Sequence, residues 1–179
     1  MKRAVIPILI LALLMACGDD ATGPEEGQSG EMTYTVEGFS FTWQQDPAST
    51  DSLIVSVTAP STGWVAVGFE PTSFMNGADL IIGYVESGTA SIRDDYGTGQ
   101  VTHDSDVNLG GTSDIRTLSG SQAAGETTIS FKMPYNSGDQ FDKTLEEGQT
   151  YTFIFAYGAD NADDFTSTHV WAESASFEL

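Results

Sequence analysis

The stretch of sequence that decides the fold comprises residues 63–69, GWVAVGF, and residues 74–85, FMNGADLIIGYV. Each holds a short run of apolar residues, and Glu, Pro, Thr and Ser lie between the two segments. Short apolar runs bounded by turn-forming residues predict β-strands. We therefore expect two consecutive strands, at residues 64–69 and 80–85, joined by a loop that contains Phe74 and Met75.

Much of the remaining chain from residue 31 onward alternates apolar and polar residues with a period of two. The apolar positions are Met32, Tyr34 and Val36; Phe39, Phe41 and Trp43; Leu53, Val55 and Val57; Ile129, Phe131 and Met133; and Tyr151, Phe153, Phe155 and Tyr157. Clusters of Gly, Pro, Asn, Asp and Ser separate these runs, a pattern typical of an all-β sandwich or barrel. No segment has a convincing helical period, and residues 141–148 are expected to hold one helical turn at most. Trp43, Trp64 and Phe153 are expected in the core.

The charge and the cysteine count exclude several classes of protein. The 179 residues include 26 Asp and Glu, 6 Lys and Arg, 2 His and 1 Cys, with a net charge of −20. A chain this acidic lacks the basic face that binds nucleic acid. A single Cys excludes an internal disulfide and a site built from several Cys, such as an iron–sulfur cluster.

The start of the chain has the layout of an export signal. Lys2 and Arg3 precede an apolar run over residues 4–14 that is too short to span a bilayer. The run ends in LMAC, residues 14–17, which resembles the lipobox of bacterial lipoproteins and places the only Cys, Cys17, at the lipid attachment site. We expect residues 1–16 to be a lipoprotein signal peptide. The protein is then exported and anchored through Cys17 to a membrane of the bacterial cell envelope, the outer membrane or the periplasmic face. An ordinary secretory signal with a chance Cys is the alternative.

Residues 17–30 are expected to form a flexible tether between the lipid and the domain. After Cys17 this segment contains no large apolar residue and is rich in Gly, Asp and Glu. Such a composition buries too little surface to offset the entropy of ordering. The folded domain is therefore expected over residues 31–179.

The segments quoted above, with four further ones, resemble the DOMON domain. The further segments are IRDDYGTG at residues 92–99, ISFKMP at 129–134, YTFIFAYG at 151–158 and HVW at 169–171. The resemblance covers residues 31–179, and its most specific part is GW-x-A-x-GF followed by M-x-x-AD-x-x-x-GY. It implies an immunoglobulin-like antiparallel β-sandwich of the kind found beside dopamine β-hydroxylases and in cellobiose dehydrogenases.

The resemblance also implies a cofactor. Haem-binding members of this family hold b-type haem between one Met and one His, and the matching positions here are Met75 and His169. A thioether and an imidazole suit low-spin haem iron, and Met/His ligation favours electron transfer. With both axial positions filled, we expect an electron carrier that exchanges single electrons with a redox protein partner, and not an enzyme. No sequence motif of a hydrolase, nucleotide-binding or zinc-protease site is present.

Other residues compete for these roles. His103 lies in the acidic segment THDSD and is expected to be solvated, whereas Met133 alternates with Phe131 and is expected in the core. A copper site made by His103, His169 and Met75 is conceivable from the ligand types. Asp79, in the AD pair of the family, is expected to accept hydrogen bonds from loop N–H groups.

Two acidic loops and a second functional class complete the alternatives. The D-x-D-x-N run at residues 104–108 fails the EF-hand pattern because Leu109 and Ile115 stand where Gly and an acid are needed. Residues 160–164 form a second acidic loop, and both loops are expected to be merely solvated.

The main alternative function is a module without haem that binds a sugar or another small ligand. Its candidate aromatic residues are Phe74, Tyr96 and Tyr135. A purely structural surface lipoprotein is the third alternative.

Overall fold

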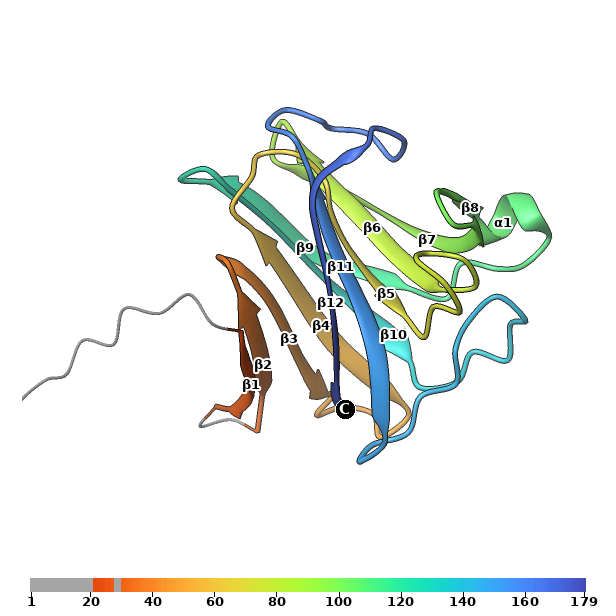
Figure 1. Cartoon of the computed structure of the whole chain (residues 1–179). Coiled ribbons are helices and arrows are strands. Elements are labelled where there is room, and N and C mark those ends of the chain that lie inside the picture. Colours follow the sequence, from red (N-terminus) through yellow and green to blue (C-terminus); the bar gives the residue numbers. More distant parts are fainter. Residues whose placement is uncertain (1–20, 28–29) are drawn as a thin grey trace, which may run out of the picture.

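The computed structural model describes residues 21–27 and 30–179 (Figure 1). The expected signal peptide at residues 1–16 and the lipidation residue Cys17 lie outside the described residues. Within the described part, no helix is long and apolar enough to cross a membrane.

In the described residues, two six-stranded antiparallel sheets pack face to face and confirm the predicted all-β sandwich (Figure 1). One sheet has the order β1-β2-β3-β4-β10-β9, and the other has the order β12-β11-β5-β6-β7-β8. The strands of the first sheet are β1 (Thr22–Glu26), β2 (Met32–Val36), β3 (Phe39–Gln45), β4 (Ser52–Ala59), β9 (Arg116–Ala123) and β10 (Glu126–Pro134). Those of the second are β5 (Val65–Phe69), β6 (Asp79–Glu86), β7 (Thr89–Gly99), β8 (Thr102–Ser105), β11 (Thr150–Gly158) and β12 (His169–Glu178).

Aromatic rings fill the space between the sheets. Phe41 of β3 is fully buried, and its ring centroid lies 5.4 Å from that of Phe153 and 5.0 Å from that of Trp43. Met133 of β10 is also buried in this core, as predicted. Because inward residues alternate with outward ones along each strand, the period-two pattern of the sequence identified this core correctly.

The central strands of the second sheet are apolar on both faces. Every residue of β5 is buried, and so are the first five of β6. Val65 and Ile81 point into the core, whereas Ala66 and Ile82 lie on the opposite face in a second cluster with Trp64. Trp64 is buried, as predicted, but in this second cluster and not between the two sheets. A continuous apolar run does not reveal which face of the sheet each side chain occupies.

Residues 141–148, expected to hold one helical turn at most, hold none, and the helical turn of the described residues lies elsewhere. It is α1 (Asp106–Leu109), which Ser105 caps by accepting the N–H of Asn108 at 3.3 Å, and Gly110 ends it with a φ of 95°. These are ordinary start and stop signals. Residues 141–148 contain no helix, because the N–H groups of Lys143 and Leu145 bond instead to Asp79 and to the carbonyl of Tyr135.

Part of the expected tether is a strand. β1 lies within residues 17–30 and pairs antiparallel with β2, with Thr22 opposite Thr35 and Glu26 opposite Met32. Composition did not reveal this pairing because it rests on backbone hydrogen bonds to an open sheet edge, which require no apolar side chain. The flexible tether over the rest of residues 17–30 stays a prediction.

Four carboxylates face one another where β6, β7, α1 and the β10–β11 loop meet. Asp79, Asp94 and Asp106 are buried and Asp142 is half-buried. Burial, reinforced by the neighbouring acids, raises the pKa of Asp94 to about 7 and that of Asp106 to about 8. The pKa values of Asp79 and Asp142 are raised for the same reason. The other charged groups nearby are Asp114, Asp139 and Lys143.

These raised pKa values predict that, in a chelator, the protein becomes less stable as the pH rises. Each acid stays protonated in the folded protein at a pH where it ionises in the unfolded chain, so its contribution to stability is full below about pH 4 and is lost as the pH rises through about 7 to 8. The urea midpoint should therefore be lower at pH 8.5 than at pH 5.5. In Asp94→Asn, the urea midpoint should differ less between pH 5.5 and pH 8.5 than it does in the wild type. An unchanged pH dependence in that variant would contradict a raised pKa of Asp94.

Candidate functional site

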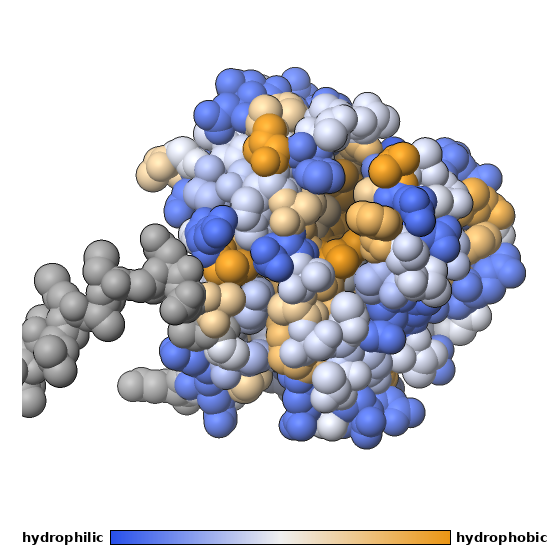
Figure 2. Space-filling model, in the orientation of Figure 1, coloured by the Kyte–Doolittle hydropathy of each residue, from blue (hydrophilic) through white to orange (hydrophobic). Residues whose placement is uncertain are grey.

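A cavity of about 550 Å³ opens on the outer face of the second sheet. Figure 2 shows this face, with a hollow in which hydrophobic side chains gather. The floor consists of apolar or small residues from three neighbouring strands: Ala66, Gly68, Leu80, Ile82, Ile154 and Ala156. The absence of a side chain at Gly68 lets Leu80 and Ile154 pack closely over it. A Cβ there would lie 2.5 Å from Leu80 Cδ2 and 2.7 Å from Ile154 Cγ1. The outer face of β5, β6 and β11 is thus the base of a ligand-sized pocket.

Met75 reaches this cavity from the β5–β6 loop. The loop folds on itself, since the Met75 carbonyl accepts the N–H of Ala78 at 3.1 Å. It also bonds to β7, because Gly77 N–H donates to the Gly97 carbonyl at 2.7 Å and Gly97 N–H donates to the Ala78 carbonyl at 2.9 Å. A Cβ at Gly97 would lie only 1.7 Å from the Met75 carbonyl oxygen. The loop therefore holds Met75 in place only because residue 97 has no side chain.

His169 lines the same cavity from β12, at the opposite edge of the second sheet. It is the first residue of β12 and lies opposite Gly158 of β11, and its side chain is exposed. β12 and the β7–β8 pair form opposite edges of this sheet. The structure thus brings both predicted ligand residues, Met75 and His169, to one cavity although they are distant in the sequence.

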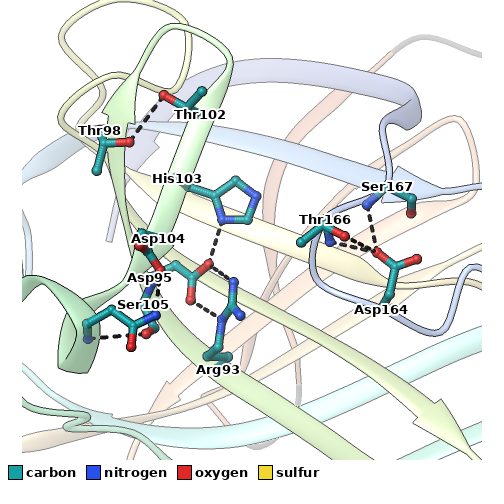
Figure 3. Close-up of polar contacts among 11 residues, drawn as sticks. Arg93, Asp95, Thr98, Thr102, His103, Asp104, Ser105, Asp164, Thr166 and Ser167 are labelled. Carbon is teal, nitrogen blue, oxygen red and sulfur yellow. Dashed lines mark hydrogen bonds and ion pairs between the residues drawn. The ribbon is translucent and has the colours of Figure 1, made fainter.

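His103 is not solvated as expected. It lies on β8 and lines the cavity, and its Nδ1 lies 2.5 Å from Oδ2 of Asp95, which is fully buried (Figure 3). Arg93 donates to both oxygens of that carboxylate, at 2.5 and 2.6 Å. A carboxylate paired with a guanidinium is an acceptor, so Nδ1 of His103 carries the proton and donates it. The acidic sequence context did not reveal this ion-paired site because the partners come from the adjacent strand β7.

The same cluster connects to the β11–β12 loop, which packs on the outer face of the sheet beside the cavity. The Arg93 guanidinium lies 4.4 Å from the centroid of the Phe165 ring, and Phe165 packs on Tyr84. Trp64 Nε1 donates to Ser167 Oγ at 2.8 Å. Asp164 accepts the N–H groups of Thr166 and Ser167, both at 2.6 Å, and folds this loop locally (Figure 3). The β11–β12 loop is thus fixed to the cavity wall by packing and hydrogen bonds.

The candidates for a sugar site do not form a common surface. Phe74 lines the cavity and is 74% exposed. Tyr96 instead packs against Phe141, and Tyr135 packs against the main core. A flat group of stacked aromatic rings at the cavity mouth is therefore not formed by these three residues.

The acidic loops use several of their carboxylates for local structure. Asp104 accepts the N–H of Ser105 and the side-chain amide of Asn108, both at 2.8 Å, and these bonds lower its pKa. Asp160 accepts the N–H of Thr62 at 2.9 Å, and its pKa is likewise lowered. Asp79 accepts the N–H of Lys143 at 3.1 Å, as expected for a structural residue. Asp106, the second acid of the D-x-D-x-N run, points inward to the buried carboxylates.

The chain belongs to the DOMON family, because the family model for the DOMON domain matches residues 37–158. This range includes Met75 and ends before His169. A comparison with curated proteins found no match. The fold is similar to that of the cytochrome domain of Myriococcum thermophilum cellobiose dehydrogenase, with a TM-score of 0.61 and 15% identity over 90% of this chain and 89% of that one. It is also similar to the cytochrome b domain of pyranose dehydrogenase from Coprinopsis cinerea, with a TM-score of 0.55 and 16% identity over 87% of this chain and 80% of that one.

The contact between Gly97 and the Met75 loop predicts a strong effect of a single methyl group. Gly97→Ala places a Cβ against the Met75 carbonyl and should destabilise the protein by about 2–3 kcal/mol, as overpacking does. Urea unfolding measures this loss, and hydrogen exchange should increase over residues 72–78. Gly23→Ala is the matched control, because nothing lies within 4 Å of a Cβ there. Equal stability of the two variants would contradict the contact.

Proposed function

We propose that the cavity binds one b-type haem between Met75 and His169, and that the protein exchanges single electrons with a redox protein. The observation that carries this proposal is the convergence of a thioether and an imidazole on one apolar cavity. The names of the two similar solved structures, both cytochrome domains of dehydrogenases, support it.

The residues present fit a haem better than a single metal ion. A cavity of about 550 Å³ with an apolar floor suits a flat macrocycle. Met75, His169 and His103 all line it, so the three residues of the alternative copper site are also present. A mononuclear copper site, however, needs no cavity of this size. When bound, the haem would supply one-electron chemistry, and Met/His ligation would raise its reduction potential.

The arrangement of the sheet favours His169 as the imidazole opposite Met75. The Met75 loop bonds to Gly97 of β7, and Gly97 lies opposite His103 in the β7–β8 ladder. Met75 and His103 therefore approach the cavity from the same side, whereas His169 approaches from the opposite sheet edge. Two residues that hold a haem would lie on opposite faces of it. We therefore assign His103 to the wall of the cavity and not to the haem iron.

The mouth of the cavity supports electron exchange with a protein partner. His169 is exposed, and Phe74 and Val101 line the opening with 74% and 85% of their surface accessible. A bound haem would thus lie close to a surface that carries apolar side chains, which are frequent in protein interfaces. With both axial positions occupied, the iron would offer no site for a substrate, so we assign electron transfer and no catalytic reaction.

Absorption spectra with and without dithionite test the haem proposal. The purified protein, supplied with haem, should show a low-spin Soret band that shifts on reduction. His169→Ala should lose the low-spin spectrum. Met75→Ala should lower the reduction potential by on the order of 100 mV, a fraction of the range of about 0.8 V that axial ligands set. His103→Ala is the control and should keep the low-spin spectrum.

Two outcomes would overturn this assignment. A colourless protein that takes up no added haem would exclude haem binding altogether. Loss of the low-spin spectrum in His103→Ala, with Met75→Ala unaffected, would show that an imidazole and not the thioether is the second ligand.

We further propose that Cys17 carries a lipid that anchors the domain in the cell envelope. Several acyl chains on one Cys would give stable anchoring, whereas a single chain binds only marginally. Cys17→Ala should move the protein from the detergent phase to the aqueous phase in a detergent-partition assay. Unchanged partitioning in that variant would exclude Cys17 as the anchor.

A further inference from the structure

Three carboxylates form a compact group on the core side of β7, away from the cavity. One oxygen each of Asp79, Asp94 and Asp142 lie within 4.8 Å of one another. Ligand oxygens bound to one Ca²⁺ at about 2.3–2.6 Å are separated by up to about 5 Å. Asp79 and Asp94 each use one oxygen to accept a backbone N–H, from Lys143 at 3.1 Å and from Asp114 at 2.9 Å. The geometry therefore leaves oxygens available for a cation.

Asp106, the fourth acid, is further evidence that this group requires a positive charge. Asp106 of α1 is 0% exposed, and no basic side chain or backbone N–H group donates to either of its carboxylate oxygens. Its one side-chain hydrogen bond is to Asp142, another acid, whose Oδ1 is also buried. Unpartnered buried carboxylates are costly, and proteins keep them where they pair with a cation or coordinate a metal.

No side-chain cation of the described residues neutralises this group. The ion pairs of the structure join Arg93 and His103 to Asp95, and Lys132 to Asp46. Asp95 follows Asp94 directly, but successive residues of a strand point to opposite faces. Arg93 and His103 are therefore engaged on the cavity side of β7. The donors to the acids on its core side are uncharged: backbone N–H groups of Lys143 and Asp114, and the side chain of Ser137.

We propose that Asp79, Asp94, Asp106 and Asp142 form a binding site for one Ca²⁺ ion. The space beside Asp79, Asp94 and Asp142 is about 10 Å³, room for about one water-sized sphere. Mg²⁺ keeps several of its waters and would not fit, whereas Ca²⁺ accepts a shell made of protein oxygens. The expected dissociation constant is about 10⁻⁴–10⁻³ M, the range of extracellular calcium modules.

The position of the site gives the ion a structural role next to the cavity. Asp79 directly follows the Met75 loop, and Asp94 directly precedes the Asp95 that holds His103. A bound ion would join β6, β7, α1 and the β10–β11 loop, and so would fix the strands from which the cavity wall is built. This inference does not depend on haem, because it rests on the opposite side of β7.

Calorimetric titration of EDTA-treated, haem-free protein with CaCl₂ tests the proposal. In about 0.15 M KCl, which screens weak binding to the acidic surface, one Ca²⁺ should bind per chain. The melting temperature should rise by roughly 5 °C or more in about 10 mM CaCl₂. The same concentration of MgCl₂ should give a much smaller rise. Elemental analysis before the titration establishes that the protein has been stripped of metal.

Variants locate the ion. Asp94→Asn and Asp142→Asn should fold, since each removes a repelling charge and Asn keeps an acceptor oxygen, but each should lose the response to Ca²⁺. Asp51→Asn, an exposed residue in the loop before β4, is the matched control and should respond as the wild type does. Absence of binding to the stripped wild-type protein would overturn the proposal, as would an unchanged response in both cluster variants.

Discussion

The feature on which the rest of the structure depends is a sheet that is apolar on both faces. β5, β6 and β11 cover the aromatic core with one face and present Ala66, Ile82 and Ile154 on the other. Apolar surface is stable only when it is removed from water. The β11–β12 loop covers one part of the outer face with Phe165, and the rest is the cavity floor. The part of the second apolar face that the loop leaves open is therefore the base of the proposed haem site.

β7 connects the proposed haem site and the proposed ion site. Its alternation directs Asp95 to the cavity side, where it holds Arg93 and His103, and directs Asp94 to the core side among other acids. Gly97, two residues further on, receives the Met75 loop. One strand thus sets the place of the thioether, fixes one imidazole and contributes a ligand to the proposed ion site. A shift of one residue in its register would disturb all three.

The period-two pattern predicted the strands β2, β3, β4, β10 and β11 and the core residues Phe41 and Met133, and the sequence motifs predicted the family. Resemblance to that family predicted Met75 and His169, which the structure brings to one cavity. The outward position of Trp64 could not be predicted, because a strand with two apolar faces has no alternation to interpret. The His103–Asp95 pair and the four-acid group could not be predicted either. They depend on the register of β7 against β8 and on contacts between segments that are distant in the sequence.

The pairing of β1 with β2 has a mechanical consequence. If Cys17 is anchored as we propose, tension from the membrane would reach the domain at Thr22, the first residue of β1, which pairs with Thr35 of β2. Pulling there separates the ladder one hydrogen bond after another, because the load falls on a single bond at a time. Release of the five residues of β1 adds up to about 17 Å of chain. Under that proposal, this edge strand would be a reserve of length that lets the domain reach farther from the membrane and pair again when the load is removed.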